Sequence, residues 1–147
     1  MIRRRLRDLP GHRGGGGAVE FALVLGPLIF LILGAMEYGR LLWTKQALEE
    51  TAIAGARCMG VLATGCAASG AFSATNATAY IQGVASGFSL TVPTANVALN
   101  RAATCAGVAG FSSVSISYTF QAAVPVLLGA ASSAMPLTAT ACFPNNA

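Results

Sequence analysis

Few side chains in this 147-residue sequence could do chemistry. Hydrolytic and metal sites need histidine or carboxylates beside a nucleophile or an ion. The sole histidine, His12, lies in the basic N-terminal segment, and no Asp or Glu follows Glu50. The cysteine and histidine spacings match no zinc site, and the glycine run 14–17 lacks the lysine and strand of a phosphate loop. We therefore expect a protein that is not an enzyme, with no cofactor and no metal site.

Glu20 is the most informative of the carboxylates, because it lies near the start of an apolar run, residues 18–36. As a helix this run would span about 28 Å, close to the thickness of the hydrocarbon layer of a bilayer. A carboxylate at the bilayer centre costs about 2.5–3.5 kcal/mol on insertion scales, and less near an interface. Glu20 therefore needs either a proton or a cationic partner.

The basic residues before this run predict its orientation in the membrane. The segment before it accounts for the whole net charge of +4, since it holds Arg3, Arg4, Arg5, Arg7 and Arg13 against Asp8. Basic residues beside a first membrane helix stay in the cytoplasm, so the part after Met36 is expected outside. The net charge gives no argument for nucleic-acid binding. We divide the chain into a leader, 1–15, a helix, 16–60, and an outer domain, 61–147.

The helix is expected to continue beyond the lipid to about Cys58. Gly26 and Pro27 predict a kink or local unwinding, because proline donates no N–H to the preceding turn. Glu37 with Arg40, and Lys45 with Glu49, are expected to form exposed ion pairs that add little stability. The face that would pack on a sheet comprises Leu41, Leu48, Ala52, Gly55, Ala56 and Met59.

The outer domain is expected to combine one short helix with an antiparallel sheet. The helical period covers residues 75–86, with Ser73 or Thr75 as its cap. Strands are predicted at 89–92, 97–99, 113–121 and 137–143, and the alternation is clearest in 113–121. The fold class is therefore α+β: a long N-terminal transmembrane helix, a short helix and three or four antiparallel strands.

The four cysteines all lie on the predicted outer side, where an even number favours two disulfides in one of three connectivities. Cys58 ends the long helix and Cys66 follows in a glycine-containing loop, so a short bridge between them is favoured. Cys105, in the turn before the main strand, and Cys142, in the last strand, could pair across the sheet. The spacing alone does not fix this connectivity.

The start of the apolar helix resembles a known processing site. Gly15 is followed by four residues, 16–19, and then by Glu20 and Phe21, as in type IV prepilins. The wider run, residues 15–57, resembles the TadE-like minor pseudopilins of the tight-adherence (Flp/Tad) pilus, including Pro27 and the segment 37–40. The major pilins of these systems usually have Tyr where this chain has Phe21.

The resemblance implies a pilin-like fold and processing by a prepilin peptidase, which would cut after Gly15 and make Gly16 the new amino terminus. The run Gly14 to Gly17 leaves the exact position of the cut open. Glu20 would then pair with the ammonium group of a neighbouring subunit; the alternative is a protonated acid at the interface. The implied partners are other pilins and pseudopilins, the pilus assembly platform and the lipid bilayer.

The predicted function is therefore that of a minor pseudopilin that takes part in assembling a Flp/Tad-type pilus for adhesion or secretion. The protein would cross the bacterial inner membrane once, with its C-terminal domain in the periplasm, and could enter a surface pilus. The runner-up is a single-span periplasmic scaffold or binding protein with no filament role. The mature amino terminus distinguishes pilin processing at Gly16 from conventional signal cleavage near Ala35 and from an uncut anchor beginning at Met1.

Overall fold

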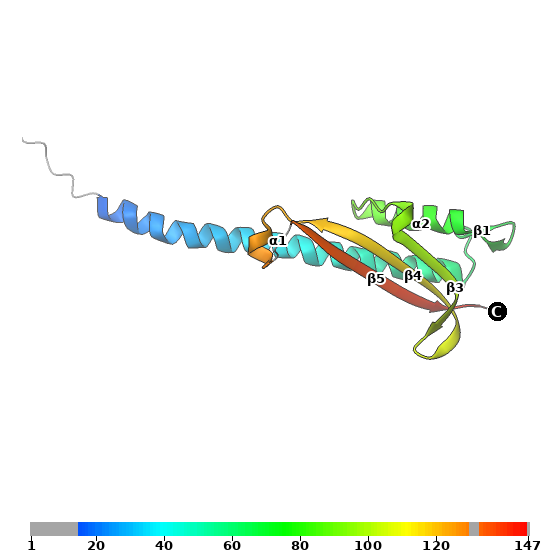
Figure 1. Ribbon diagram of the computed structural model, residues 1–147. Helices are drawn as coiled ribbons and strands as arrows, with labels where there is room; N and C mark the ends of the chain where they lie inside the picture. Colours follow the sequence, from blue (N-terminus) through cyan, green and yellow to red (C-terminus); the bar gives the residue numbers. More distant parts are fainter. Residues whose placement is uncertain (1–14, 130–132, 147) are drawn as a thin grey trace, which may run out of the picture.

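The computed structural model describes residues 15–129 and 133–146 and shows a long helix whose second half carries a small α+β domain (Figure 1). The expected fold class is confirmed, including the short helix and an antiparallel sheet of three strands. The helices and strands, in chain order, are α1 Gly15–Gly60, β1 Ala67–Ala68, β2 Ala71–Phe72, α2 Ala74–Gly87, η1 Thr94–Asn96, β3 Val97–Cys105, β4 Val108–Gln121, η2 Pro125–Leu128 and β5 Ala134–Pro144.

The first half of α1 stands free of the outer domain. In the described part of the chain, it forms the one helix that is long and apolar enough to cross a membrane, and its most apolar stretch is not buried. This indicates single-pass anchoring in a membrane. The helix continues without interruption through Gly26 and Pro27, so of the two expected distortions the local unwinding is absent, and the kink stays a prediction. A proline removes only one hydrogen bond of the helix, and the turns on either side retain theirs.

The second half of α1 is the spine of the outer domain. Leu48, Ala52, Ala56 and Met59 are buried on the face that the sequence predicted. Small residues on this face let α2 approach closely: a Cβ atom added at Gly55 would lie 2.6 Å from Cγ1 of the buried Ile81. The core of the domain thus lies between α1, α2 and the sheet.

The sheet has the order β3-β4-β5, and both pairings are antiparallel. In β4 the alternation predicted the faces correctly, since Val114, Ile116 and Phe120 are buried. β4 begins five residues earlier than the predicted strand, at Val108, and β5 begins at Ala134. Pro136 therefore lies within β5, which tolerates it because β5 is an edge strand.

The predicted strand at residues 89–92 is wrong. The backbone N–H of Leu90 donates to the carbonyl of Ala85 at 3.0 Å, so this segment closes the end of α2 instead of pairing in the sheet. Ser89 also adopts a φ of 61°, which is incompatible with a strand. The second predicted strand does form, as β3, but it extends to Cys105.

Local interactions explain the remaining elements. Ser73 caps α2 by accepting a hydrogen bond from the backbone N–H of Asn76 at 3.3 Å. Disulfides join Cys58 to Cys66 and Cys105 to Cys142, the pairing that the sequence favoured. Cys105 is the last residue of β3, whereas the sequence predicted it in the turn. The first disulfide holds the loop after α1, and the second joins the two edge strands across β4.

Candidate subunit and membrane interface

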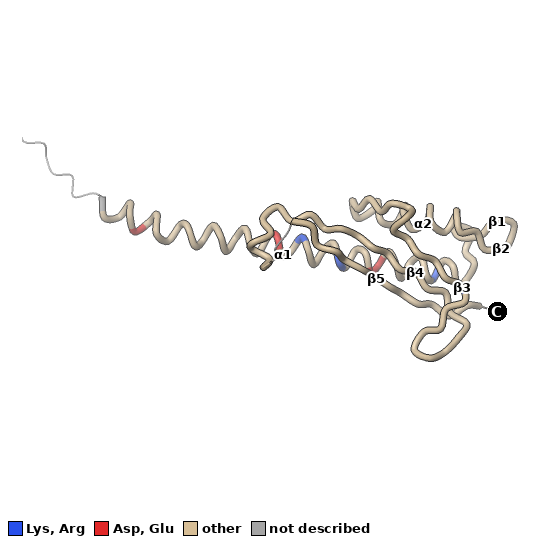
Figure 2. The backbone as a smooth tube through the Cα atoms, in the orientation of Figure 1, with Lys and Arg blue, Asp and Glu red and all other residues tan. Residues whose placement is uncertain are grey.

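The exposed apolar surface of α1 is the first candidate interface. An exposed apolar surface of this extent is covered by lipid or by other protein in the functional state. Glu20 is the single charged residue of this half of the helix (Figure 2). The large apolar side chains exposed here are Val19, Phe21, Leu23, Val24, Leu28, Ile29, Phe30, Leu31, Ile32, Leu33 and Met36.

Glu20 lies just over one turn after the start of α1 and is exposed. Within residues 15–129 and 133–146 it makes no ion pair and no side-chain hydrogen bond. Gly15 and Gly16 form the first turn of the helix, and Phe21 is 66% exposed beside Glu20. Of the glycines proposed for the cut, Gly14 lies outside the described residues. The structure thus leaves the carboxylate of Glu20 available to a partner outside this chain.

Glu37 forms a second polar site, where α1 leaves its apolar stretch. Its side chain is only 8% exposed and binds two groups. Oε2 accepts a hydrogen bond from Nη1 of Arg40 at 2.9 Å, and Oε1 accepts one from the backbone N–H of Ala123 at 2.8 Å. The sequence correctly predicted the pair with Arg40 but wrongly placed it at the exposed surface. We call Glu37, Arg40 and Ala123 the helix clamp.

Arg40 extends the helix clamp to the sheet. Its guanidinium lies 5.5 Å from the ring centroid of Phe120, which is buried at the end of β4. Such a contact between a cation and an aromatic face adds to the ion pair with Glu37. The backbone carbonyl of Arg40 also accepts a hydrogen bond from Oγ1 of Thr44 at 2.9 Å. Glu37 and Arg40, about one helical turn apart, thus both hold the end of β4 against α1.

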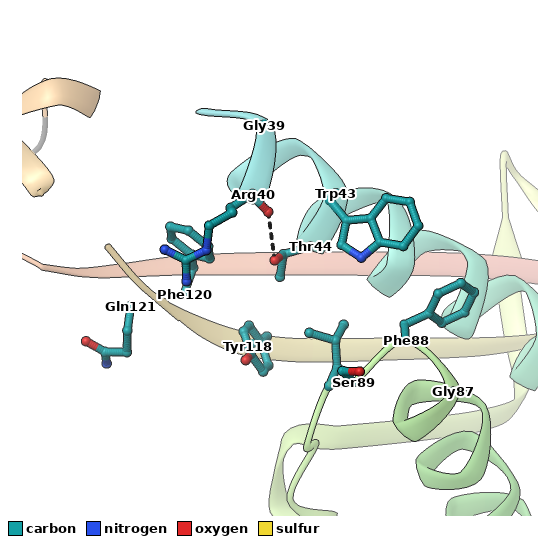
Figure 3. A pocket seen from close by; sticks show the side chains of 11 residues that line it. Gly39, Arg40, Trp43, Thr44, Gly87, Phe88, Ser89, Tyr118, Phe120 and Gln121 are labelled. Carbon is teal, nitrogen blue, oxygen red and sulfur yellow. Dashed lines mark hydrogen bonds between the residues drawn. The ribbon is translucent and has the colours of Figure 1, made fainter. Parts of the chain in front are cut away.

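A groove of about 650 Å³ opens beside the helix clamp, between α1, the end of α2 and β4 (Figure 3). Trp43 and Phe88 form one wall, with their rings edge to face and their centroids 6.5 Å apart. Tyr118 and Phe120 line the opposite side, and Arg40 supplies the charge. None of the described residues that line the groove is a carboxylate or a histidine, so these residues offer apolar and aromatic contact but no pair suited to acid–base chemistry.

The described residues also contain no group of three or more His, Cys, Asp or Glu side chains that could hold a metal ion. The helix clamp and the groove were not identified as sites from the sequence. The one available signal was the spacing of Glu37 and Arg40, which indicates an ion pair but not its burial. Burial depends on Ala123, which lies 86 residues beyond Glu37.

Comparison with known families agrees with the resemblance found in the sequence. The family described as TadE-like protein matches residues 15–57. The matched region includes Gly15, Glu20, Pro27 and the Glu37–Arg40 pair, and it ends three residues before the end of α1. This match supports involvement in the Tad pilus system in general. No curated protein and no solved structure matches the chain.

Proposed function

We propose that this protein is a minor pseudopilin that takes part, without enzymatic activity, in assembling a Flp/Tad-type pilus. The observation that carries the proposal is the exposed carboxylate of Glu20, which has no partner among the described residues and lies on an otherwise uncharged membrane segment. The match of residues 15–57 to the TadE-like family supports the system to which it is assigned.

The proposed chemistry starts with cleavage after Gly15 by a prepilin peptidase. Hydrolysis of this peptide bond gives Gly16 a free amino group and removes the arginine-containing leader. Glu20 of one subunit then accepts hydrogen bonds from the ammonium group of Gly16 on its neighbour. Each charge is costly in lipid by itself, so pairing favours the register in which the two meet.

The orientation follows from the same scheme. The leader would lie in the cytoplasm and the outer domain in the periplasm, which fits two disulfides in the outer domain. The inner-membrane assembly platform and other pilins are the proposed partners. The exposed apolar face of α1 provides the surface on which helices of neighbouring subunits would pack.

The first test is the mature amino terminus, measured by mass spectrometry of membrane extracts from cells with an active prepilin peptidase. We expect a chain that begins at Gly16. A chain that begins at Met1 would contradict the proposal and favour an uncut single-span scaffold, and one that begins near Ala35 would indicate conventional signal cleavage.

The second test separates assembly from insertion. We expect Glu20→Ala to insert and to be processed as the native chain is, but to lose pilus assembly, because the neighbour's ammonium group has no counter-ion. Glu50→Ala is the matched control: it removes an exposed acid from the same helix outside the membrane segment. Normal piliation by Glu20→Ala would refute the pairing.

A further inference from the structure

The connection between β4 and β5 carries an apolar turn that lies against α1 but leaves Val126 uncovered by the rest of the described chain. Residues Pro125–Leu128, which form η2, read Pro-Val-Leu-Leu, and Val126 is 81% exposed. Val124, just before η2, is 38% exposed. No charged residue follows Arg101 in the sequence, so the turn itself carries no charge, and the charges beside it are the paired Glu37 and Arg40 of the helix clamp. Single exposed apolar residues are common on protein surfaces. The location of Val124 and Val126 therefore decides whether their exposure points to a binding surface.

The helix clamp places η2 at the end of the membrane segment. Ala123, two residues before η2, donates its N–H to Glu37, and Glu37 directly follows Met36, the last residue of the apolar run. Glu37 and Met36 differ by only about 1.5 Å along the axis of α1. Ala123, which is bound to Glu37, therefore lies close to the end of the apolar run. Figure 1 shows η2, in orange, beside α1 at the end of the outer domain nearer the free half of the helix.

We propose that Val124 and η2 form a second membrane contact, which lies in the interfacial layer of the leaflet that faces the outer domain. The occupant is lipid, because the turn lies beside the end of the membrane segment of α1 and its own exposed residues are apolar and uncharged. Tyr38, which directly follows Glu37 and is 55% exposed, is of the type that lies at such interfaces.

The small size of the turn also favours lipid over a protein partner. A stable protein interface buries about 800 Å² on each partner, far more than one short turn supplies. Apolar residues that lie on a bilayer need only insert to the level of the headgroups. The inference depends on the membrane span of α1 and not on a role in a filament.

The contact would fix the orientation of the outer domain. A single helix leaves the outer domain free to rotate about the helix axis. A second contact with the membrane, beside the helix, would keep one side of the domain turned toward the bilayer. The helix clamp connects the two contacts, because the connection that bears η2 is bound to Glu37. The exposed groove beside Trp43 would then be held at a defined height above the membrane.

The test uses the full chain in vesicles of phosphatidylethanolamine and phosphatidylglycerol, with Trp43→Phe to remove the native fluorophore. Val126→Trp then reports the surroundings of η2. We expect its emission to be blue-shifted, strongly quenched by lipids brominated near the headgroup and weakly quenched by aqueous iodide. Val124→Trp is a second probe, and the proposal requires lipid quenching of both.

Val108→Trp is the matched control, since Val108 is 58% exposed at the hairpin between β3 and β4, at the far end of the domain (Figure 1). We expect iodide to quench this probe and brominated lipid to leave it unchanged. The proposal fails if the probes at Val126 and Val124 behave like this control. It also fails if they are shielded from iodide without quenching by lipid, since they would then contact protein.

Discussion

The carboxylate of Glu37 on α1 accepts the backbone N–H of Ala123 at 2.8 Å, and this bond joins two segments 86 residues apart. It closes the end of the outer domain nearest the membrane segment. The disulfide between Cys58 and Cys66 holds the loop at the opposite end of the helical spine. The backbone N–H of Asn146, two residues after β5, donates to the carbonyl of Gly60 at 3.0 Å. The sheet is thus attached to α1 by hydrogen bonds near both ends and by apolar packing between them.

We predict that Glu37→Ala lowers the free energy of unfolding of the outer domain by about 1–3 kcal/mol, because it leaves the N–H of Ala123 and the guanidinium of Arg40 without their acceptor. Glu37→Gln should cost less, since an amide oxygen can still accept from Ala123. Urea denaturation in detergent micelles, followed by the fluorescence of Trp43, measures both variants.

The control for Glu37 is Glu49→Ala, which removes the exposed pair with Lys45, whose charged atoms are 3.9 Å apart. We expect a change below about 1 kcal/mol, as for most exposed ion pairs. Equal losses for Glu37→Ala and Glu49→Ala would show that the helix clamp adds no more than a surface pair.

Gly55 is predicted to be intolerant of alanine. The added Cβ would lie 2.6 Å from Cγ1 and 2.8 Å from Cδ1 of Ile81, which is fully buried in α2 and cannot move aside freely. We expect Gly55→Ala to destabilise the domain by about 1–3 kcal/mol, the usual cost of overpacking. Urea or thermal denaturation measures the effect.

Gly83→Ala is the matched control for Gly55, because Gly83 lies on α2 with open space around its Cα. There the substitution should stabilise the helix by up to about 1 kcal/mol, since alanine loses less backbone entropy than glycine. If both variants were stabilising, the close packing of α1 on α2 would be refuted.

The two disulfides should contribute unequally. The bridge from Cys105 to Cys142 spans 37 residues and that from Cys58 to Cys66 spans 8. Loop-closure entropy gives about 4 and about 2.5 kcal/mol, respectively. Paired alanine substitutions at each bridge, compared by urea denaturation, should therefore lose more stability for Cys105 with Cys142. The reverse order would mean that packing around the buried Cys58 and Cys66 outweighs chain entropy.

The parts of the fold that the sequence predicted are those with local causes. The apolar period of α1 identified Leu48, Ala52 and Met59 as buried, and the alternation in β4 identified Val114 and Ile116. Both signals arise from side chains whose spacing matches the repeat of the element that contains them. The helix face and the strand face needed no knowledge of the partner surface.

The errors arose where a distant or non-repeating contact decides the structure. Residues 89–92 alternate like a strand, but the bond from Leu90 to Ala85 directs this segment back to α2. The burial of Glu37 depends on Ala123, and no local pattern reports that contact. The Glu20 pairing stays a prediction because its proposed partner belongs to another chain.

The last prediction tests whether Glu20 must project from one particular face of α1, or whether an acid at the same depth in the bilayer is enough. Moving the acid to the preceding position, in the double variant Val19→Glu with Glu20→Ala, changes its depth by about 1.5 Å but rotates it by about 100° around the helix. If the carboxylate pairs with one neighbouring amino terminus, pilus assembly should stay lost, because the acid then leaves a different face of α1.

Insertion and processing of this double variant should match the native chain, since its charge and depth in the bilayer are nearly unchanged. Piliation scored by microscopy, together with the mass of the mature amino terminus, measures assembly and processing separately. Full piliation by the double variant would show that an acid at this depth is sufficient whatever its direction. A register-selecting ion pair between subunits would then be excluded, while the membrane span of α1 would stand.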